Sequence, residues 1–390
     1  MKRIAIVVSH PIQHFCPQYG SIAKVPGLAL RVFFGSAMGL NNYFDKHFKQ
    51  EISWKGLNLD SFDHFFLNNK DTIPVDKNLD APDLEAGLSS FKPDIVIVYG
   101  YSQKLSGRAV RWAKRNGVKT GYIADSELNN GKKDLVKDTI KQVYLRYYFR
   151  KIDFFFSVGH SNRLYYKKYG VRESSICRMH FPIDVEVYKK SWLEKQALRQ
   201  AVRAQYGISD NELVISVVGK LVSWKSQSHL VDAASVLESK GISVTIFIVG
   251  SGEDAEEIRH QAEKLVKSKV IITGFISPED LPGYYAASDI YAHPAAFEPH
   301  SLAISEAIYM GLPVIISNRC GSFGPDDDVE VNKNGFVYPF GDIGELSGYI
   351  AALAADRQKM NAFGEASRRI AVTNQEIAHR ECWTALHKVI

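Results

Sequence analysis

The chain has 390 residues, of which 45% are hydrophobic and 23% charged, a globular composition long enough for two domains. The net charge of +5 is a mild basic excess, compatible with phosphate-bearing ligands or an anionic surface. No apolar run reaches the roughly 18 residues of a membrane span, the opening "IAIVV" is too short for a signal peptide, and four dispersed cysteines indicate a reduced, cytosolic protein.

The first half of the chain alternates short apolar runs with longer amphipathic stretches. Strands are predicted at 3–9, 28–36, 94–100, 119–125 and 153–159, and helices at 106–117 and 135–152. Such alternation is typical of a parallel, doubly wound sheet. The pattern breaks at 177–192, which has no clean period and contains Pro182.

A second alternating series follows this break. Strands are predicted at 213–219, 244–250, 269–275, 289–295 and 312–318, and helices at 193–207, 228–241, 253–268 and 301–311. A last helix is expected at 376–390, after a break at Thr373–Asn374. The sequence therefore predicts an α/β protein with two doubly wound domains, whose ligands bind beyond the carboxyl ends of the strands.

The segment "EPHSLAISE" (298–306) places two glutamates around a predicted helix start. Pro299 fits the first helical turn, so the amides of 300–302 would point outward and, with the helix dipole, suit a phosphate. Glu306 would lie roughly 12 Å along the axis from Glu298. That span suits a nucleotide-diphosphate sugar, because a carboxylate accepts two hydroxyl donors. The alternative is an ordinary loop acid and an ordinary helix acid.

Lys220 and Lys225 lie in the loop between a predicted strand and helix. Two cations there would neutralise a diphosphate leaving group, although solvated surface lysines are the simpler reading. The nearby "VGSGEDA" (249–255) is a weak form of the dinucleotide fingerprint. The acid expected about 20 residues later is missing, which argues against a nicotinamide enzyme.

Five segments together resemble the donor domain of the family 4 glycosyltransferases, retaining enzymes of the GT-B fold. In family order they are "GKLVSWK" (219–225), "IVGSGED" (248–254), "TGFISPEDLPGYYAASDIYAHPA" (273–295), "EPHSLAISE" (298–306) and "NGFVYPFGD" (334–342). The resemblance covers roughly 214–348. It implies two Rossmann-like domains facing a central cleft. The acceptor-binding domain would be 1–184, with the C-terminal helix 373–390 packing back on it, and the donor-binding domain 185–372.

The resemblance also implies residue roles. Lys220 and Lys225 would contact the diphosphate, Glu298 the transferred sugar and Glu306 the ribose. His300 stands where the family usually has phenylalanine, between Pro299 and Ser301 in place of glycines, and is expected as an extra donor-side contact. The other implied donor-side residues are Gly250, Phe275, Ile276, Ser301 and Leu302.

Two segments of the first half offer further contacts. His10 and Gln13 follow the first strand and are expected to touch phosphates or acceptor; alternatively, the loop only packs Phe15 and Tyr19. Asp125 ends another strand, where it would bind acceptor hydroxyls or assist proton removal. A helix N-cap role is the alternative for Asp125.

The predicted reaction moves a sugar from a nucleotide-diphosphate sugar, UDP- or GDP-linked, to a hydroxyl of a glycan or lipid-linked glycan, with retention and in cell-surface polysaccharide or glycoconjugate synthesis. No cofactor and no metal are expected, because no Asp-x-Asp motif suits the donor site and "GPDDDVE" (324–330) aligns with a variable loop. Three alternatives stay open: an epimerase or hydrolase of the same fold, a polymer-extending enzyme, and a non-catalytic donor-binding subunit.

The stretch "IKQVYLRYYFRKID" (140–153) interleaves basic and aromatic residues. Basic amphipathic helices lie on anionic membranes, whereas a buried aromatic face with a solvated basic face is the simpler structural reading. No nucleic-acid recognition module accompanies the patch. The expectation is a cytoplasmic protein with room for peripheral contact at the inner face of the membrane.

Overall fold

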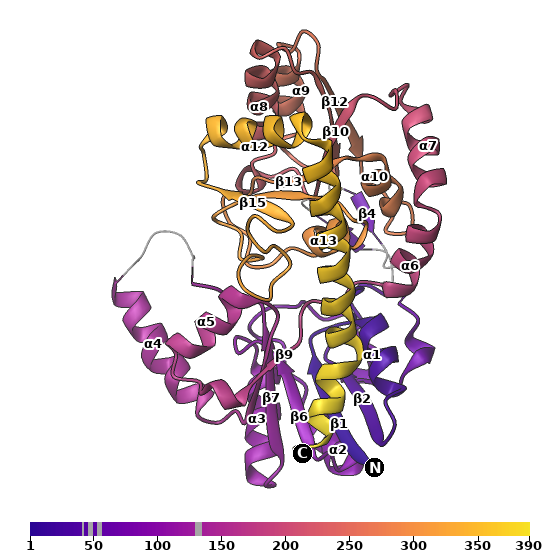
Figure 1. The fold of residues 1–390 in the computed structure, drawn as a ribbon. Helices are drawn as coiled ribbons and strands as arrows, with labels where there is room; N and C mark the ends of the chain where they lie inside the picture. The colour runs from indigo at the N-terminus through magenta and orange to yellow at the C-terminus, as the bar shows by residue number, and fades with distance from the viewer. Residues whose placement is uncertain (41–42, 46–49, 53–56, 129–134) are drawn as a thin grey trace. The chain divides into compact units, whose positions relative to one another are not determined.

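The computed structural model describes residues 1–40, 43–45, 50–52, 57–128 and 135–390. The chain divides into two compact units, each built on a parallel sheet (Figure 1). The first unit comprises Met1–Asp45, Gln50–Asp184 and Gln375–Ile390, and the second comprises Val185–Asn374. In the described parts of the chain, no helix is both long and apolar enough to cross a bilayer.

The first unit contains a seven-stranded sheet in the order β5-β2-β1-β6-β7-β8-β9, with every neighbouring pair parallel. The order reverses between β1 and β6, which makes the carboxyl ends of these strands the switch point of the sheet. The strands are β1 Lys2–Val8, β2 Leu28–Phe34, β5 His64–Phe66, β6 Ile95–Tyr99, β7 Lys119–Ala124, β8 Phe154–Ser157 and β9 Ile176–Arg178. The helices are α1 Cys16–Ala23, α2 Leu84–Phe91, α3 Lys104–Arg115, α4 Leu135–Phe149, α5 His160–Lys168 and α14 Cys382–His387, and a short antiparallel pair is formed by β3 Tyr43–Asp45 and β4 Gln50–Ile52.

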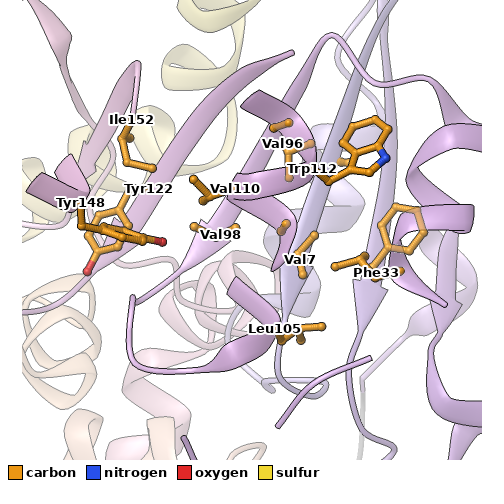
Figure 2. Close-up of a cluster of buried hydrophobic side chains, with 14 of the residues drawn as sticks. Val7, Phe33, Val96, Val98, Leu105, Val110, Trp112, Tyr122, Tyr148 and Ile152 are labelled. Carbon is orange, nitrogen blue, oxygen red and sulfur yellow. The ribbon is translucent and has the colours of Figure 1, made fainter. Parts of the chain in front are cut away.

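Side chains of β1 alternate between two hydrophobic cores, one on each face of the sheet. Val7 belongs to the core covered by α2, α3 and α4, where Figure 2 shows it with Trp112 and Tyr148. Ile6 belongs to the core on the opposite face. Burial on both faces explains why the strands of this sheet appear in the sequence as nearly continuous apolar runs.

The C-terminal residues complete the second of these cores. Trp383 on α14 is fully buried, and its ring stacks on that of Phe156 with the centroids 5.4 Å apart. Gln18 Nε2, on α1, donates to the carbonyl of Ala378 at 2.8 Å, which joins the C-terminal segment to the first helix. The core of the first unit therefore contains residues from both ends of the chain.

The break predicted at Thr373–Asn374 is wrong. Helix α13 (Arg357–Glu376) runs through both residues, and the irregularity comes later, as a π-helical turn at Ile377–Glu381. Asn374 is buried and donates its side-chain amide to Asp328 Oδ1 at 2.9 Å. A tertiary hydrogen bond thus satisfies a residue that would otherwise favour a turn.

The second unit contains a six-stranded sheet in the order β12-β11-β10-β13-β14-β15, again with every neighbouring pair parallel. Its order reverses between β10 and β13. The strands are β10 Leu213–Val218, β11 Val244–Val249, β12 Lys269–Gly274, β13 Ile290–His293, β14 Val314–Ser317 and β15 Gly335–Tyr338. The helices are α6 Val185–Leu193, α7 Lys195–Gln205, α8 Ser228–Ser239, α9 Ala255–Ala262, α10 Leu281–Ala287, α11 Leu302–Tyr309, α12 Ile343–Ala355 and α13.

Helix α6 was not predicted, and the helix expected at 253–268 is shorter, spanning only α9. On α6 only Tyr188 and Ser191 are buried, so the sequence shows no apolar stripe at helical spacing there. On α9 only Ile258 is buried. Both errors have the same cause, because periodicity detects a helix only where one face enters a core.

Candidate active site

The predicted donor-side residues of the second unit gather at one edge of its sheet. Because all six strands are parallel, the loops that follow their carboxyl ends lie at the same edge. The loop after β10 and the loop after β13 flank the point where strand order reverses, which is where doubly wound sheets bind ligands. The residues concerned, loop by loop, are Lys220 and Lys225, Gly250, Phe275 and Ile276, and Glu298.

An ion pair joins the two loops at this point. Lys225 ends a short 3-10 turn (Ser223–Lys225), and its ammonium contacts Glu298 Oε2 from the other loop. The backbone holds the same loops together, since the amide of Ala296 donates to the carbonyl of Trp224 at 2.7 Å. The Lys225 and Glu298 side chains keep 20% and 14% of their surface exposed, so a ligand can reach both.

A buried histidine lies within hydrogen-bonding distance of the Glu298 carboxylate. Nε2 of His293, on β13, lies 3.1 Å from Glu298 Oε2, and the hydroxyl of Tyr291 lies 3.1 Å from Nδ1 of the same ring. Burial lowers the pKa of His293. A neutral ring that donates from Nε2–H to the carboxylate and accepts the tyrosine proton at Nδ1 fits these distances.

Sequence reasoning missed His293. The available signal was a tyrosine and a histidine two residues apart in a buried strand, because such spacing places both side chains on one face.

The surroundings of Glu298 keep its carboxyl ionised. Burial alone would raise the pKa of Glu298, but the hydrogen bond from His293 and the charge of Lys225 outweigh burial and lower that pKa to about 2. A fixed negative charge therefore stands at the switch point, next to a cation.

Glu306, on α11, behaves in the opposite way. It accepts a hydrogen bond from the Tyr285 hydroxyl at 2.8 Å. Burial raises the pKa of Glu306 to about 7, although hydrogen bonds from Tyr285 and Tyr188 act against this. The two acids of the segment thus differ in protonation near neutral pH, a separation that marks distinct roles in many sites.

Helix α11 begins three residues later than Pro299, so the prediction that this proline occupies the first turn is wrong. Leu302 is the first helical residue, and Ser301, with extended backbone, occupies the N-cap position. The amide of Ser301 donates to Ser322 Oγ at 3.0 Å. The amide of Ile304 donates to the carbonyl of Ser301 at 3.1 Å, and the amides of Leu302 and Ala303 stand before it at the open end of the helix.

His300 is turned into the protein. Its side chain is 1% exposed, and Nε2 lies 3.3 Å from Asp328 Oδ2. In this structure the imidazole is therefore not placed for the expected donor contact. It instead joins the loop before α11 to the acidic stretch that the sequence assigned to a variable loop.

Two acids of that stretch, Asp327 and Asp328, are nearly inaccessible. Together with His300 they form a group whose potential ligand atoms lie within 4.8 Å of one another. Ser305 Oγ donates to Asp328 Oδ2 at 2.5 Å, and the Asp328 amide donates to Asp327 Oδ1 at 2.8 Å. These bonds, with that from Asn374, make the group an anchor for the start of α11.

Gly250 permits two loops of the site to touch. Its φ is +145°, and a Cβ there would lie 2.0 Å from the carbonyl oxygen of Gly219, closer than any real contact. The loop that carries Lys220 is also fixed by a hydrogen bond from Gln227 Nε2 to the Lys220 carbonyl at 2.9 Å. At the neighbouring strand end, Phe275 is exposed, whereas Ile276 packs against an apolar cluster of the unit.

The first unit holds the remaining predicted residues at its own strand ends. His10 and Gln13 follow β1, at the switch point of that sheet. Burial lowers the pKa of His10 to about 4, and its Nδ1 lies 2.9 Å from Ser9 Oγ. Phe15 and Tyr19 from the same segment are buried, so the packing role expected for this loop is present.

Asp125 is exposed directly after β7. The alternative of a helix N-cap is wrong for it, because α4 begins only at Leu135. Asp125 therefore stands at the carboxyl edge of the first sheet, as the sequence predicts.

Comparison with known proteins finds a family match within the second unit. Residues 199–370 match the family described as glycosyl transferases group 1. A GDP-mannose-dependent alpha-(1-6)-phosphatidylinositol monomannoside mannosyltransferase of Mycobacterium tuberculosis is 30% identical over 180 residues, 44% of this chain and 46% of its own. A UDP-Gal:alpha-D-GlcNAc-diphosphoundecaprenol alpha-1,3-galactosyltransferase of Escherichia coli is 27% identical over 179 residues, 45% and 44% of the two chains. The matched part thus spans about half the length of these relatives.

Solved structures extend the likeness to the whole chain at the level of fold. A glycosyltransferase from Rickettsia africae superposes with a TM-score of 0.74 at 16% identity, covering 100% of this chain and 98% of its own. HepE of Anabaena, in complex with UDP, gives a TM-score of 0.70 at 19% identity, covering 100% and 99%. The fold is therefore the GT-B type that the sequence predicts, with two Rossmann-like α/β domains.

Proposed function

We propose that this protein is a retaining glycosyltransferase of family 4. It moves a sugar from a nucleotide-diphosphate sugar to a hydroxyl of a glycan or lipid-linked glycan, in cell-surface polysaccharide or glycoconjugate synthesis. The observation that carries the proposal is the pair of Lys225 and Glu298 across the switch point of the second sheet. It puts a cation and an ionised carboxylate side by side, beside the free end of α11.

Each part of this arrangement suits one part of the donor. The amides at the start of α11 and the ammonium groups of Lys220 and Lys225 match a diphosphate. Glu306 matches the ribose diol, since its carboxylate can accept two hydroxyl hydrogens. Glu298, held ionised, faces the sugar, whose ring gains positive charge as its bond to phosphate lengthens.

The proposed reaction breaks the bond between the anomeric carbon and the β-phosphate oxygen. The acceptor oxygen bonds to the same face of that carbon, and its proton passes to the departing phosphate oxygen. The pair of electrons from the broken bond stays on the nucleoside diphosphate, where Lys220, Lys225 and helix amides meet the new charge. In this scheme His293 positions Glu298 and does not itself contact the sugar.

The names of the relatives narrow the nucleotide base of the donor and the class of acceptor without deciding either. Their names include both GDP-mannose and UDP-galactose donors, and both acceptors named are lipid-linked. HepE binds UDP. We therefore take UDP- and GDP-linked donors and a lipid-linked acceptor as the first candidates for this chain.

The test begins with thermal-shift measurements against UDP, GDP and ADP and their sugars. The donor selected in this way is then incubated with and without acceptor, and the anomeric configuration of the product is read by NMR. Transfer with retention, unchanged in EDTA, is the expected result. Donor consumption that ignores the acceptor would indicate a hydrolase or epimerase, and nucleotide binding without turnover would indicate a non-catalytic subunit.

A further inference from the structure

Helix α4 of the first unit has two apolar faces. Leu145, Tyr148 and Phe149 are buried in the core shared with α3 and the sheet, and Figure 2 shows Tyr148 beside Tyr122. The other face, which we call the outer stripe, lies on the opposite side of the core residues. Its four members are Ile140, Val143, Tyr144 and Tyr147, with 66%, 66%, 45% and 60% of their surface exposed.

The outer stripe is a regular feature of the helix. Its members are spaced i, i+3, i+4 and i+7, so they lie along one side. Five residues after each member comes a buried residue, namely Leu145, Tyr148, Phe149 or, just past the helix, Ile152. Five residues correspond to a rotation of about 140° around the axis. A helix that only covers its own core is polar on that side, so packing of the first unit does not account for the stripe.

A shallow hollow is lined by Thr139 and the four stripe residues. Contiguous exposed apolar surface of this kind marks an interaction site on a soluble domain. Single exposed apolar residues need no such explanation, but four adjacent ones on a single helix do.

Three cations flank the outer stripe, and a fourth lies on the inner side of the helix. Arg146 and Arg150 are exposed, and Lys151 Nζ lies 4.1 Å from the centre of the Tyr147 ring. Lys141 is half-buried on the inner side, with its ammonium 5.5 Å from the centre of the Tyr165 ring. Between 138 and 151 these four basic residues stand against Asp138 alone.

We propose that the outer stripe docks on an anionic phospholipid bilayer, with α4 lying in the interface. Apolar side chains would enter the boundary between headgroups and acyl chains, a region in which tyrosine is enriched. The cations would contact lipid phosphates. Charge favours this occupant over a second copy of the chain. A symmetric pairing through the stripe would bring cations against cations, with a single acid on each side to offset them.

Docking goes beyond the proposed function, because it concerns where the enzyme works and requires neither donor nor acceptor. It would hold the first unit at the surface where a lipid-linked acceptor is found. The two proposals are separable, since binding to lipid is measured without sugar nucleotide and nucleotide binding without lipid.

The experiment is co-sedimentation of the full chain with vesicles of phosphatidylcholine alone or of phosphatidylcholine mixed with phosphatidylglycerol. We expect binding to the mixed vesicles and much weaker binding to the neutral ones. The triple variant Ile140→Ser/Val143→Ser/Tyr147→Ser should weaken binding to mixed vesicles by roughly 100-fold. Arg146→Gln/Arg150→Gln should weaken it by roughly 30-fold and remove the preference for phosphatidylglycerol.

A matched control is Leu193→Ser/Val266→Ser, which removes two apolar residues of the second unit that are 79% and 86% exposed. It should bind vesicles like the unaltered chain, and all variants should keep their nucleotide-induced thermal shift. Absence of vesicle binding, equal binding to both kinds of vesicle, or equal loss in the control would overturn the proposal. So would a dimer in light scattering that the triple variant alone dissociates, because the stripe would then bind a second copy.

Discussion

Lys225 is the residue whose removal tests the donor site most directly. Lys225→Ala deletes a charge that we propose to lie where the leaving diphosphate gains its own, so transfer should slow by on the order of 100-fold or more. Affinity for nucleoside diphosphate should fall as well. Initial rates at saturating acceptor and calorimetric titration measure the two effects.

Lys264→Ala is the matched control, because Lys264 is an exposed lysine just after α9. It should leave both quantities unchanged. Near-normal transfer by Lys225→Ala would remove Lys225 from the site.

The two glutamates should separate in kinetics. If Glu306 holds the ribose as proposed, its contact is equal before and during reaction, so Glu306→Gln should mainly raise the donor KM, the sign of uniform binding. Under the same proposal Glu298 faces the sugar as charge develops on it, so Glu298→Gln should mainly lower kcat. Steady-state rates of both variants check the split.

Free nucleoside diphosphate, which contains the ribose but not the transferred sugar, adds an independent measurement. Its affinity should drop in Glu306→Gln and stay nearly constant in Glu298→Gln. The reverse pattern would exchange the two roles, and unchanged binding and turnover in both variants would leave only a loop acid and a helix acid.

The pKa of Glu306, raised to about 7 by burial, gives nucleotide binding a pH dependence. A carboxylate accepts both ribose hydroxyls only when ionised, so binding should strengthen as pH rises through 7 and release part of a proton. Titrations at pH 6 to 8, in buffers of different ionisation enthalpy, measure this release. The nucleotide's own titration contributes equally to the unaltered protein and to Glu306→Gln, so the difference between their pH profiles reports Glu306. An identical pH profile in the variant would contradict the assignment.

At the scale of elements, two loops of the proposed donor site meet closely because Gly250 has no side chain. In Gly250→Ala the new Cβ would lie 2.0 Å from the Gly219 carbonyl, so the loop that carries Lys220 and Lys225 must move. We expect a loss of roughly 3 kcal/mol or more of stability, from overpacking and a positive φ together, with weaker nucleotide binding.

Gly241→Ala isolates the backbone effect, because Gly241 also has a positive φ of +77° but nothing within 4 Å of its Cβ position. It should lose only about 1–2 kcal/mol and keep nucleotide affinity. Thermal and urea unfolding of both variants, with titration of nucleotide, gives the comparison. Equal losses in the two variants would mean that the loops adjust freely.

At the scale of the whole molecule, the end of the chain belongs to the core of its beginning. Trp383→Ala should lower the stability of the first unit by roughly 3–5 kcal/mol, because the cavity opens between α14 and the sheet. Nucleotide binding, which we place in the second unit, should survive below the new unfolding temperature.

Calorimetric unfolding with and without nucleoside diphosphate distinguishes the two units. Val389→Ala serves as control, since Val389 is 56% exposed in the same segment. A Trp383→Ala protein as stable as this control would show that the C-terminal segment contributes little to the first core.

The sequence by itself determined the fold class and the places where chemistry gathers. Strands such as 94–100 are apolar throughout because both faces of their sheets are covered, and this leaves a plain signal. Parallel strands then put Lys220, Lys225, Gly250 and Glu298 at one edge without further information. Short elements were harder, since α6 and α9 bury too few residues to show a period.

Only the tertiary structure decided how these residues are paired and charged. Glu298 and Glu306 have the same side chain, and their pKa values separate because one meets Lys225 and His293 while the other is enclosed by Tyr285 and Tyr188. These partners come from segments distant in sequence, and electrostatic effects act over a few ångströms of space. For the same reason the acids at 327–328, polar in sequence, are buried anchors, and the outer stripe of α4, apolar in sequence, lies on the surface.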